Sequence, residues 1–260
     1  MIIDAHTHLL GDLVDLSAQD LLRSMDEAGI DRSAVFAAIN GPTNEEVVRI
    51  CKKYPDRFFA VGFASPFNPA TMVERVTGFL EDGKIRALKF YLGYEHFYPN
   101  DFGLLSRYFE ALQKTGFPAI FHTGDTYSKL KKAKLRFAHP LAIDDVAVEF
   151  PKLKIIIAHL GNPWMTDAAA VVYKNKNVYA DISGLVYNDF GALEAAYLGN
   201  RLVREVRPYL GTFKKLLFGS DFPIAHQTGY VRFFRDLLST LSEEERECVF
   251  HKNAEKLFHL

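Results

Sequence analysis

The feature that most constrains the fold is a regular alternation, along the whole chain, of short β-prone runs with amphipathic helical stretches. The β-prone runs start near eight positions, namely Ile2, Ser33, Phe58, Ile85, Phe117, Leu153, Asn177 and Lys215. Successive starts lie 24 to 38 residues apart, which is the length of one strand plus a crossover helix. Eight such units predict an α/β protein whose parallel strands close into a (β/α)8 TIM barrel.

A single domain over residues 1–260 suits the length and composition of the chain. Barrels of this type need about 250 residues, and the chain has 260 residues, of which 48% are hydrophobic. No linker, low-complexity tract or composition shift divides it. An open doubly wound sheet is the competing architecture, but it predicts a glycine-rich turn after the first strand. The sequence has His6-Thr7-His8 at that place.

Capping signals fall where the helices of this scheme should begin and end. Ser17 precedes a predicted helix at 18–28, and Gly29 follows it, whereas Thr43-Asn44-Glu45-Glu46 forms a capping box. Pro69 stands at the first position of a further predicted helix. The remaining signals predict helices at 104–114 before Gly116, at 143–150 before Pro151, and after Ser242.

Charge and cysteine content exclude several classes of function. Lys and Arg total 31 against 32 for Asp and Glu, so no overall field attracts nucleic acid or a membrane surface. The two cysteines, Cys51 and Cys248, lie outside every motif, which argues against a disulfide framework. No signal-peptide pattern or run of about 18 apolar residues is present. We therefore expect a cytoplasmic protein with a small-molecule substrate, and the sequence leaves a homo-oligomer open.

Four of the predicted strands end in a potential metal ligand. His6 and His8 follow the first strand, and because strand side chains alternate between faces, both imidazoles point the same way. His122, His159 and Asp221 end three later strands. The C-terminal ends of barrel strands meet at one mouth, where catalytic groups collect. Imidazoles with one carboxylate suit zinc or a similar first-row ion that activates a bound water.

These motifs resemble the amidohydrolase superfamily, and specifically its amidohydrolase-2 branch, which includes enzymes similar to aminocarboxymuconate-semialdehyde decarboxylase. The resemblance covers the whole chain and is carried by six segments, at 4–8, 88–90, 121–124, 158–161, 219–223 and 253–258. It implies that His6, His8, His122 and Asp221 bind a divalent metal, usually zinc. It also implies that His159 lies beside the metal-bound water or the substrate. Asp221 and His159 are then the expected catalytic residues.

Lys89, at the end of the fourth predicted strand, bears on the number of metals. Hydrolases of this superfamily often carry a carboxylated lysine there that bridges two metals, so the resemblance makes Lys89 a candidate ligand. An ammonium group would instead repel a metal cation. The side chain must therefore be carboxylated, deprotonated or turned toward the substrate, and either one or two metals per chain is consistent with the sequence.

Hydrolysis of a small molecule by a metal-activated water is the first functional expectation. The alternative is non-oxidative decarboxylation of an acidic small molecule, because relatives use nearly the same ligands for both reactions. Lys89 favours hydrolysis, since decarboxylases of this branch commonly lack that lysine. Five cations between Lys129 and Arg136 lie in the loop after His122. A solvated loop is the preferred interpretation, and an anion-attracting lid is the alternative.

Overall fold

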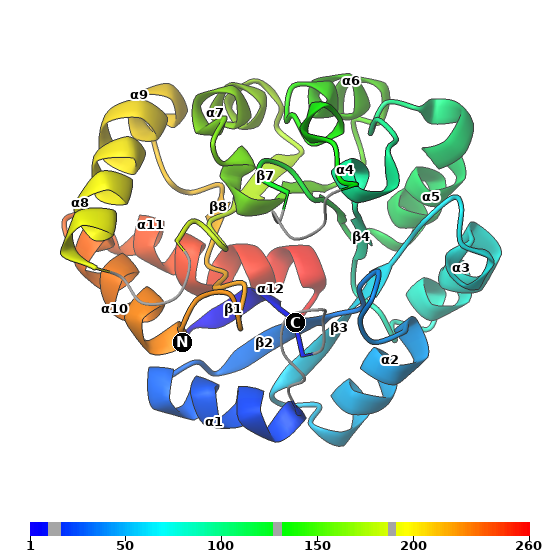
Figure 1. Cartoon of the computed structure of the whole chain (residues 1–260), viewed down its shortest axis with the longest axis horizontal. Coiled ribbons are helices and arrows are strands. Elements are labelled where there is room, and N and C mark those ends of the chain that lie inside the picture. Colours follow the sequence, from blue (N-terminus) through cyan, green and yellow to red (C-terminus); the bar gives the residue numbers. More distant parts are fainter. Residues whose placement is uncertain (10–16, 127–131, 187–190) are drawn as a thin grey trace.

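The computed structural model describes residues 1–9, 17–126, 132–186 and 191–260. Its strands form one parallel sheet in the order β1 to β8 (Figure 1). Their bounds are β1 (Ile3–Thr7), β2 (Arg32–Phe36), β3 (Phe58–Phe63), β4 (Leu88–Phe90), β5 (Ala119–Phe121), β6 (Ile155–Ile157), β7 (Val178–Asp181) and β8 (Leu216–Leu217). Each strand begins within three residues of its predicted start. The expected TIM barrel is therefore confirmed.

Backbone contacts between the first and last strands close the barrel. The Ala5 amide donates to the Phe218 carbonyl at 2.9 Å, and Thr7 forms a parallel bridge with Phe222. These contacts place the end of β1 directly beside the segment that follows β8. Residues far apart in the sequence are thereby held at one point of the barrel mouth.

Helices surround the sheet as an outer ring (Figure 1). The α-helices are α1 (Ala18–Ala28), α2 (Asn44–Lys53), α3 (Val73–Glu81), α4 (Leu92–Glu95), α5 (Phe102–Thr115), α6 (Ala142–Glu149), α7 (Met165–Lys174), α8 (Ala192–Arg201), α9 (Arg207–Leu210), α10 (Gln227–Leu238), α11 (Glu243–Glu247) and α12 (Asn253–Phe258). Short 3-10 helices span Pro69–Thr71, Leu135–Phe137 and Ala158–Gly161, and π-helical turns span Leu202–Val206 and Cys248–Lys252.

The predicted caps at Ser17, Thr43 and Ser242 explain where α1, α2 and α11 begin. Ser17 forms a capping box with Asp20, and α1 ends at Gly29 in the left-handed region, as the sequence predicts. Pro69 behaves differently, because it opens a short 3-10 turn and α3 begins only at Val73. The physical reason is that the Thr71 hydroxyl accepts from the Ser65 amide at 3.1 Å, which ties the turn to the end of β3.

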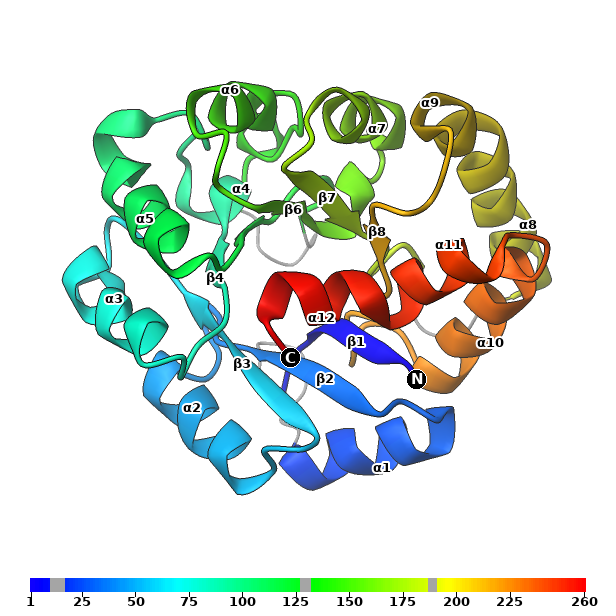
Figure 2. The ribbon, with the colours of Figure 1, turned by 180° about the vertical axis from the view of Figure 1, so that it is seen from behind.

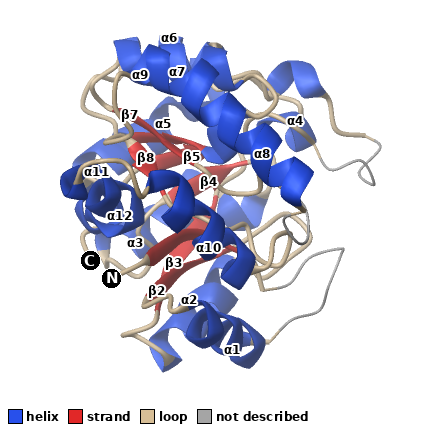
Figure 3. Cartoon of the chain, turned by 90° about the vertical axis from the view of Figure 1, so that its left-hand side faces the viewer, coloured by secondary structure: helices blue, strands red, loops and turns tan. Residues whose placement is uncertain are grey.

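The barrel interior is closed by apolar packing at one end and lined by polar side chains at the other. Inward side chains of the strands form a core of branched and aromatic residues, among them Ile3, Phe59 and Leu217. At the N-terminal ends of the strands, α12 crosses the barrel and inserts Leu257 and Phe258 into this core (Figure 2). The side view shows α12 on the same side as both chain ends (Figure 3). The opposite end, where the strands terminate, holds the polar residues described next.

Candidate metal centre

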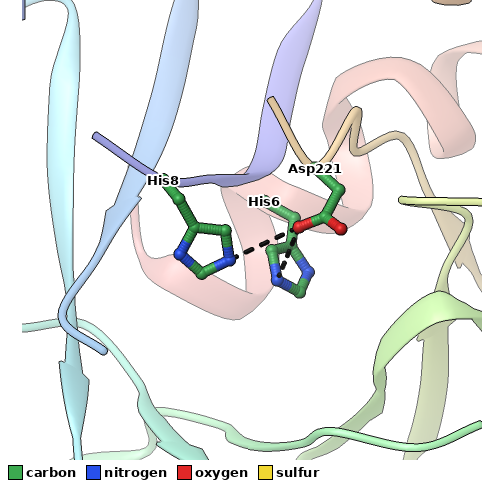
Figure 4. Close-up of side chains that lie close together, drawn as sticks. All are labelled: His6, His8 and Asp221. Carbon is green, nitrogen blue, oxygen red and sulfur yellow. Dashed lines mark ion pairs between the residues drawn. The ribbon is translucent and has the colours of Figure 1, made fainter. Parts of the chain in front are cut away.

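His6, His8 and Asp221 converge at the mouth, as the sequence predicts (Figure 4). Asp221 Oδ1 lies 3.7 Å from His6 Nε2 and 3.4 Å from His8 Nε2. Ligand atoms held at about 2.0–2.2 Å by one tetrahedral ion lie roughly 3.4 Å from each other. The spacing and the chemistry of these three donors therefore fit a divalent metal ion.

Backbone geometry aims Asp221 at the two histidines. Its φ of 65° lies in the left-handed region, which costs free energy for a side chain other than glycine. The Asp221 amide donates to the His6 carbonyl at 2.9 Å. The preceding residue, Ser220, donates from its amide and its hydroxyl to the buried Asp4 carboxylate, at 2.9 and 2.6 Å. Asp4 thus fastens the Asp221 segment to β1.

Asp181 orients the His6 ring. Its Oδ2 lies 3.0 Å from His6 Nδ1, so this nitrogen donates and Nε2 keeps its lone pair for a metal. Burial lowers the pKa of His6 well below its ordinary value, with further lowering by nearby Lys89, which keeps the ring neutral and able to ligate. Asp181 ends β7, so its position at a strand end is the sequence signal that could have indicated it, as it indicated the other candidate ligands.

The structure places His122 and His159 together, outside the His6, His8 and Asp221 group. His122 Nδ1 and His159 Nε2 are 3.2 Å apart. The Asp125 carbonyl, 3.0 Å from His122 Nε2, can only accept, so that nitrogen carries the proton of a neutral His122. Burial lowers the pKa of His122 to about 3 and that of His159 well below its ordinary value. His122 as a metal ligand and His159 as a catalytic residue stay predictions.

Lys89 lies within the centre and is fully buried. Its Nζ is 3.3 Å from His6 Nε2 and lies 5.4 Å and 5.5 Å from the ring centroids of Phe36 and Tyr91. Burial lowers the pKa of Lys89 to about 8, against the opposing charges of Asp181 and Asp221. An amine at this position contacts the proposed metal ligands directly. Its role as a ligand itself stays a prediction.

The segment after β7 forms a tight wall of the site. Ser183 Oγ lies 2.9 Å from His159 Nδ1 and 3.1 Å from His6 Nδ1. Gly184 follows with a φ of 59°, and a Cβ there would stand 2.6 Å from Asp221 Oδ2 and 3.1 Å from His159 Nδ1. Only glycine fits at this position. Neither residue is predictable as part of the site from the sequence, because neither has a side chain typical of metal ligands.

His6, His159 and Asp181 also lie close enough together to form a second group of potential ligands. Asp181 accepts hydrogen bonds from His6 Nδ1 and from the His159 amide, and these two bonds account for the grouping.

The cationic loop predicted above the site is described only from Lys132 onward, so Lys129 and Lys131 lie outside the described residues. Its last cation, Arg136, lies over the Phe137 ring at 4.7 Å.

A parallel eight-stranded barrel with imidazole and carboxylate groups at its strand ends is the architecture of a metal-dependent TIM-barrel enzyme. A comparison of the sequence with family models identifies the family of such enzymes to which the chain belongs. The amidohydrolase model of the amidohydrolase-2 branch matches residues 3–260. The chain therefore belongs to the amidohydrolase-2 family, and the resemblance inferred from the sequence is confirmed. A comparison with curated protein sequences gives no match.

Solved structures with the same fold include a probable hydrolase and several decarboxylases. A probable 2-pyrone-4,6-dicarboxylic acid hydrolase from Acinetobacter baumannii shares 14% identity at a TM-score of 0.73, over 100% of this chain and 99% of that one. A 2,6-dihydroxybenzoate decarboxylase from Rhizobium shares 17% at 0.70, over 99% and 98%. A 5-carboxyvanillate decarboxylase from Novosphingobium aromaticivorans, with bound manganese, shares 18% at 0.70, over 94% and 82%. At these identities the likeness supports the fold.

In the part of the chain that the structure describes, no helix is both long enough and apolar enough to cross a membrane.

Proposed function

We propose that this amidohydrolase-family enzyme is a metal-dependent decarboxylase of a small aromatic acid. The observation that carries the proposal is Lys89, a buried amine beside His6 and between two aromatic rings. An ammonium at this position, turned toward the substrate, can pair with a carboxylate. Decarboxylases of aromatic acids among the similar solved structures, for 2,6-dihydroxybenzoate and for 5-carboxyvanillate, support an aromatic substrate. In the sequence, the presence of Lys89 favoured hydrolysis over decarboxylation. In the structure, the position of the same residue supports decarboxylation.

Different residues of the chain would bind the metal, orient the substrate and deliver the proton in this reaction. His6, His8 and Asp221 would hold a divalent ion, which when bound supplies a Lewis acid for a substrate oxygen. Lys89 would orient the acid through its carboxylate or a neighbouring anionic oxygen. The C–C bond breaks, the carboxylate leaves as carbon dioxide, and a proton takes up the bonding electron pair at the ring carbon. Asp221 and His159 are the proposed groups that hold and deliver this proton.

Hydrolysis is the second candidate, and the same lysine supports it under one condition. Lys89 Nζ stands 3.3 Å from a ligand nitrogen, so a carboxylated Lys89 would itself join the ligand set and could bring a second metal. Water would then be the nucleophile and a C–N or C–O bond would break. The probable 2-pyrone-4,6-dicarboxylic acid hydrolase with this fold is consistent with that chemistry.

The native metal, the location and the substrate class are also proposals. Zinc is the ion that the donor set suggests, and the manganese of the similar decarboxylase makes manganese the second candidate. A small-molecule substrate and a cytoplasmic location follow from the near-neutral charge and the sequence patterns described above.

The test measures metal content and reaction class together. We expect chelator-sensitive carbon dioxide release from a panel of hydroxylated benzoic acids, with one metal per chain. Lys89→Met should keep the metal and lose most of the activity, whereas Lys52→Met, on the exposed face of α2, should keep both. Turnover only of lactones, amides or esters, with two metals that fall to one in Lys89→Met, would contradict decarboxylation and establish hydrolysis.

A further inference from the structure

Basic side chains gather at the closed end of the barrel, opposite the metal centre. Each even-numbered strand is preceded or opened by one of them, in the order Arg32, Arg86, Lys154 and Lys215 along β2, β4, β6 and β8. Alternate strands of a TIM barrel contribute side chains to the same interior layer. Together with Lys256 and His259, from α12 and the residue after it, they form what we call the basal cation cluster.

The strand register directs these side chains under the barrel. Arg32, Lys154 and Lys215 each stand two residues before an inward-facing residue of the interior core, namely Ala34, Ile156 and Leu217. Residues two apart in a strand share a face. Arg86 donates to the Phe258 carbonyl at 2.9 Å, which places its guanidinium at the end of α12.

Contacts with α12 complete the cluster around Tyr179. Lys256 Nζ donates to the Tyr179 hydroxyl at 3.1 Å, and Lys215 Nζ lies 6.0 Å from the same ring. Lys154 Nζ lies 3.4 Å from His259 Nε2. The basic side chains of the cluster therefore lie near one another at the closed end of the barrel.

The cluster lacks acidic partners. Across the described ranges, no Asp or Glu side chain forms an ion pair with any of its six members. Basic residues elsewhere at the surface do form such pairs, for example Arg57 with Asp26 at 2.7 Å and Lys84 with Asp82 at 2.6 Å. The basic side chains of the cluster are thus not neutralised by ion pairs in the described ranges, although the chain as a whole carries a net charge of −1.

Lowered pKa values of three basic side chains, and one buried donor without a hydrogen-bond partner, accompany this lack of ion pairs. Burial, followed by the neighbouring charge of Lys256, lowers the pKa values of Lys154 and Lys215. Burial and then Arg32 do the same for the pKa of Arg86. Arg32 Nε is buried without a hydrogen-bond partner in the described structure. Lys215 donates to the Val172 and Asn175 carbonyls at 2.9 and 2.6 Å, but carbonyl dipoles offset only part of a full charge.

We propose that the basal cation cluster is a binding site for a phosphate group, either free or carried by a small metabolite. Several ammonium and guanidinium donors with one phenol hydroxyl match the acceptor-rich surface of a multivalent oxyanion. The site shares no residue with the metal centre, so an anion bound there does not compete with the substrate. It stabilises the closed end of the barrel by supplying the missing negative charge.

The test follows thermal unfolding of the metal-loaded protein as inorganic phosphate replaces chloride at constant ionic strength. At roughly ten times the Kd, phosphate should raise the Tm by about 3–5 °C. The double variant Lys154→Gln/Lys256→Gln should lose most of this rise, whereas Lys52→Gln, with one exposed cation removed from α2, should keep it. Phosphate bound at the metal contributes equally in all three proteins, so the difference between them isolates the cluster.

Calorimetric titration with inorganic phosphate and with glycerol phosphate gives a second measurement that does not depend on stability. A Kd that weakens at least tenfold in the double variant supports the site with either probe, and the tighter probe indicates the source of the phosphate group. A Tm rise and a Kd that are the same in all three proteins, or no effect of phosphate beyond that of chloride, would overturn the proposal.

Discussion

At the scale of single residues, the geometry of the candidate metal centre depends on the hydrogen-bond partners of the proposed ligands as much as on the ligands themselves. Asp181 accepts from His6 Nδ1 and also from the His159 backbone amide at 2.9 Å. One carboxylate therefore fixes the orientation of an expected ligand and of an expected catalytic residue. Partners of this kind set metal affinity through the tautomer and the direction of the ring.

Asp181→Asn should weaken metal binding by roughly 10- to 100-fold, because the amide accepts less strongly and no longer fixes the His6 tautomer. The measurement is a metal titration with a competing chelator. Asp82→Asn, which changes an exposed carboxylate, is the control and should bind metal like the unchanged protein. An equal affinity in Asp181→Asn would show that His6 is held by packing against Phe36 instead.

His8 and His122 should respond differently to substitution. His8 shares a point with His6 and Asp221, whereas His122 Nδ1 is paired with His159. We expect His8→Ala to weaken metal binding by about 100-fold or more and His122→Ala to weaken it less. The loss of a ligand removes a direct bond to the ion, whereas the loss of a neighbour only alters its surroundings. Equal losses would instead support the four-residue ligand set that the family resemblance implies.

Glu95, at the end of α4, makes stability depend on pH. Burial raises its pKa from 4.5 to about 7, although the Ser65 hydroxyl donates to it. The folded state therefore holds the proton more tightly than the unfolded chain. The contribution of Glu95 to stability is complete below about pH 4.5 and declines as the pH rises to about 7.

Glu95→Gln should remove this dependence and raise the free energy of unfolding at pH 8 by about 1–2 kcal/mol, less than the full shift implies because the carboxyl is partly solvated. The check is denaturant unfolding of both proteins between pH 4.5 and 8. Parallel pH profiles for the two proteins would show that Glu95 titrates normally.

At the scale of elements, β7 and the turn after it form the segment that positions the proposed functional side chains. This short segment supplies Asp181, Ser183 and Gly184, which contact three of the proposed functional side chains. A turn packed so closely against the ligands leaves no room for a larger residue.

Gly184→Ala should displace Asp221 and His159, because its Cβ would lie 2.6 Å and 3.1 Å from their side-chain atoms. We expect metal affinity to fall by roughly tenfold or more, with an added cost of about 1 kcal/mol for the left-handed backbone. Gly78→Ala is the matched control, since Gly78 lies within α3 with open space around it, and it should stabilise the protein slightly. Unchanged metal binding in Gly184→Ala would mean that the wall can move.

At the scale of the whole molecule, the two ends of the barrel have separate roles. The mouth carries the metal centre on strand ends and loops, whereas the other end is sealed by α12 and bordered by the basal cation cluster. Residues at the sealed end should therefore affect stability with little effect on the metal site.

Phe258→Ala tests this separation. Phe258 is fully buried and its ring lies 4.9 Å from that of Phe59. Its truncation should lower the free energy of unfolding by about 3–4 kcal/mol, because a cavity remains in the interior core. Tyr173→Ala, at an exposed aromatic residue of α7, should change it by less than about 0.5 kcal/mol. Metal content per folded molecule should be unchanged in both, and metal loss in Phe258→Ala would show that the two ends are coupled.

The sequence by itself determined the barrel and most of its local boundaries. Strand starts, the N-cap at Ser17, the capping box at Thr43 and the end of α1 at Gly29 all depend on interactions within a few residues, so local patterns predict them. The convergence of His6, His8 and Asp221 was also predictable. Parallel strands bring their C-terminal ends to one mouth whatever the packing details are.

Only the tertiary structure decided which side chains share a single point. His122 ends its strand as His6 does, yet its ring is turned toward His159, because the Asp125 carbonyl holds its other nitrogen. Ser183 and Gly184 matter through contacts between the turn after β7, β1 and the segment after β8, which no local pattern encodes. The basal cation cluster likewise exists because barrel closure brings together Arg32, Arg86, Lys154 and Lys215, each more than fifty positions from the next in the sequence.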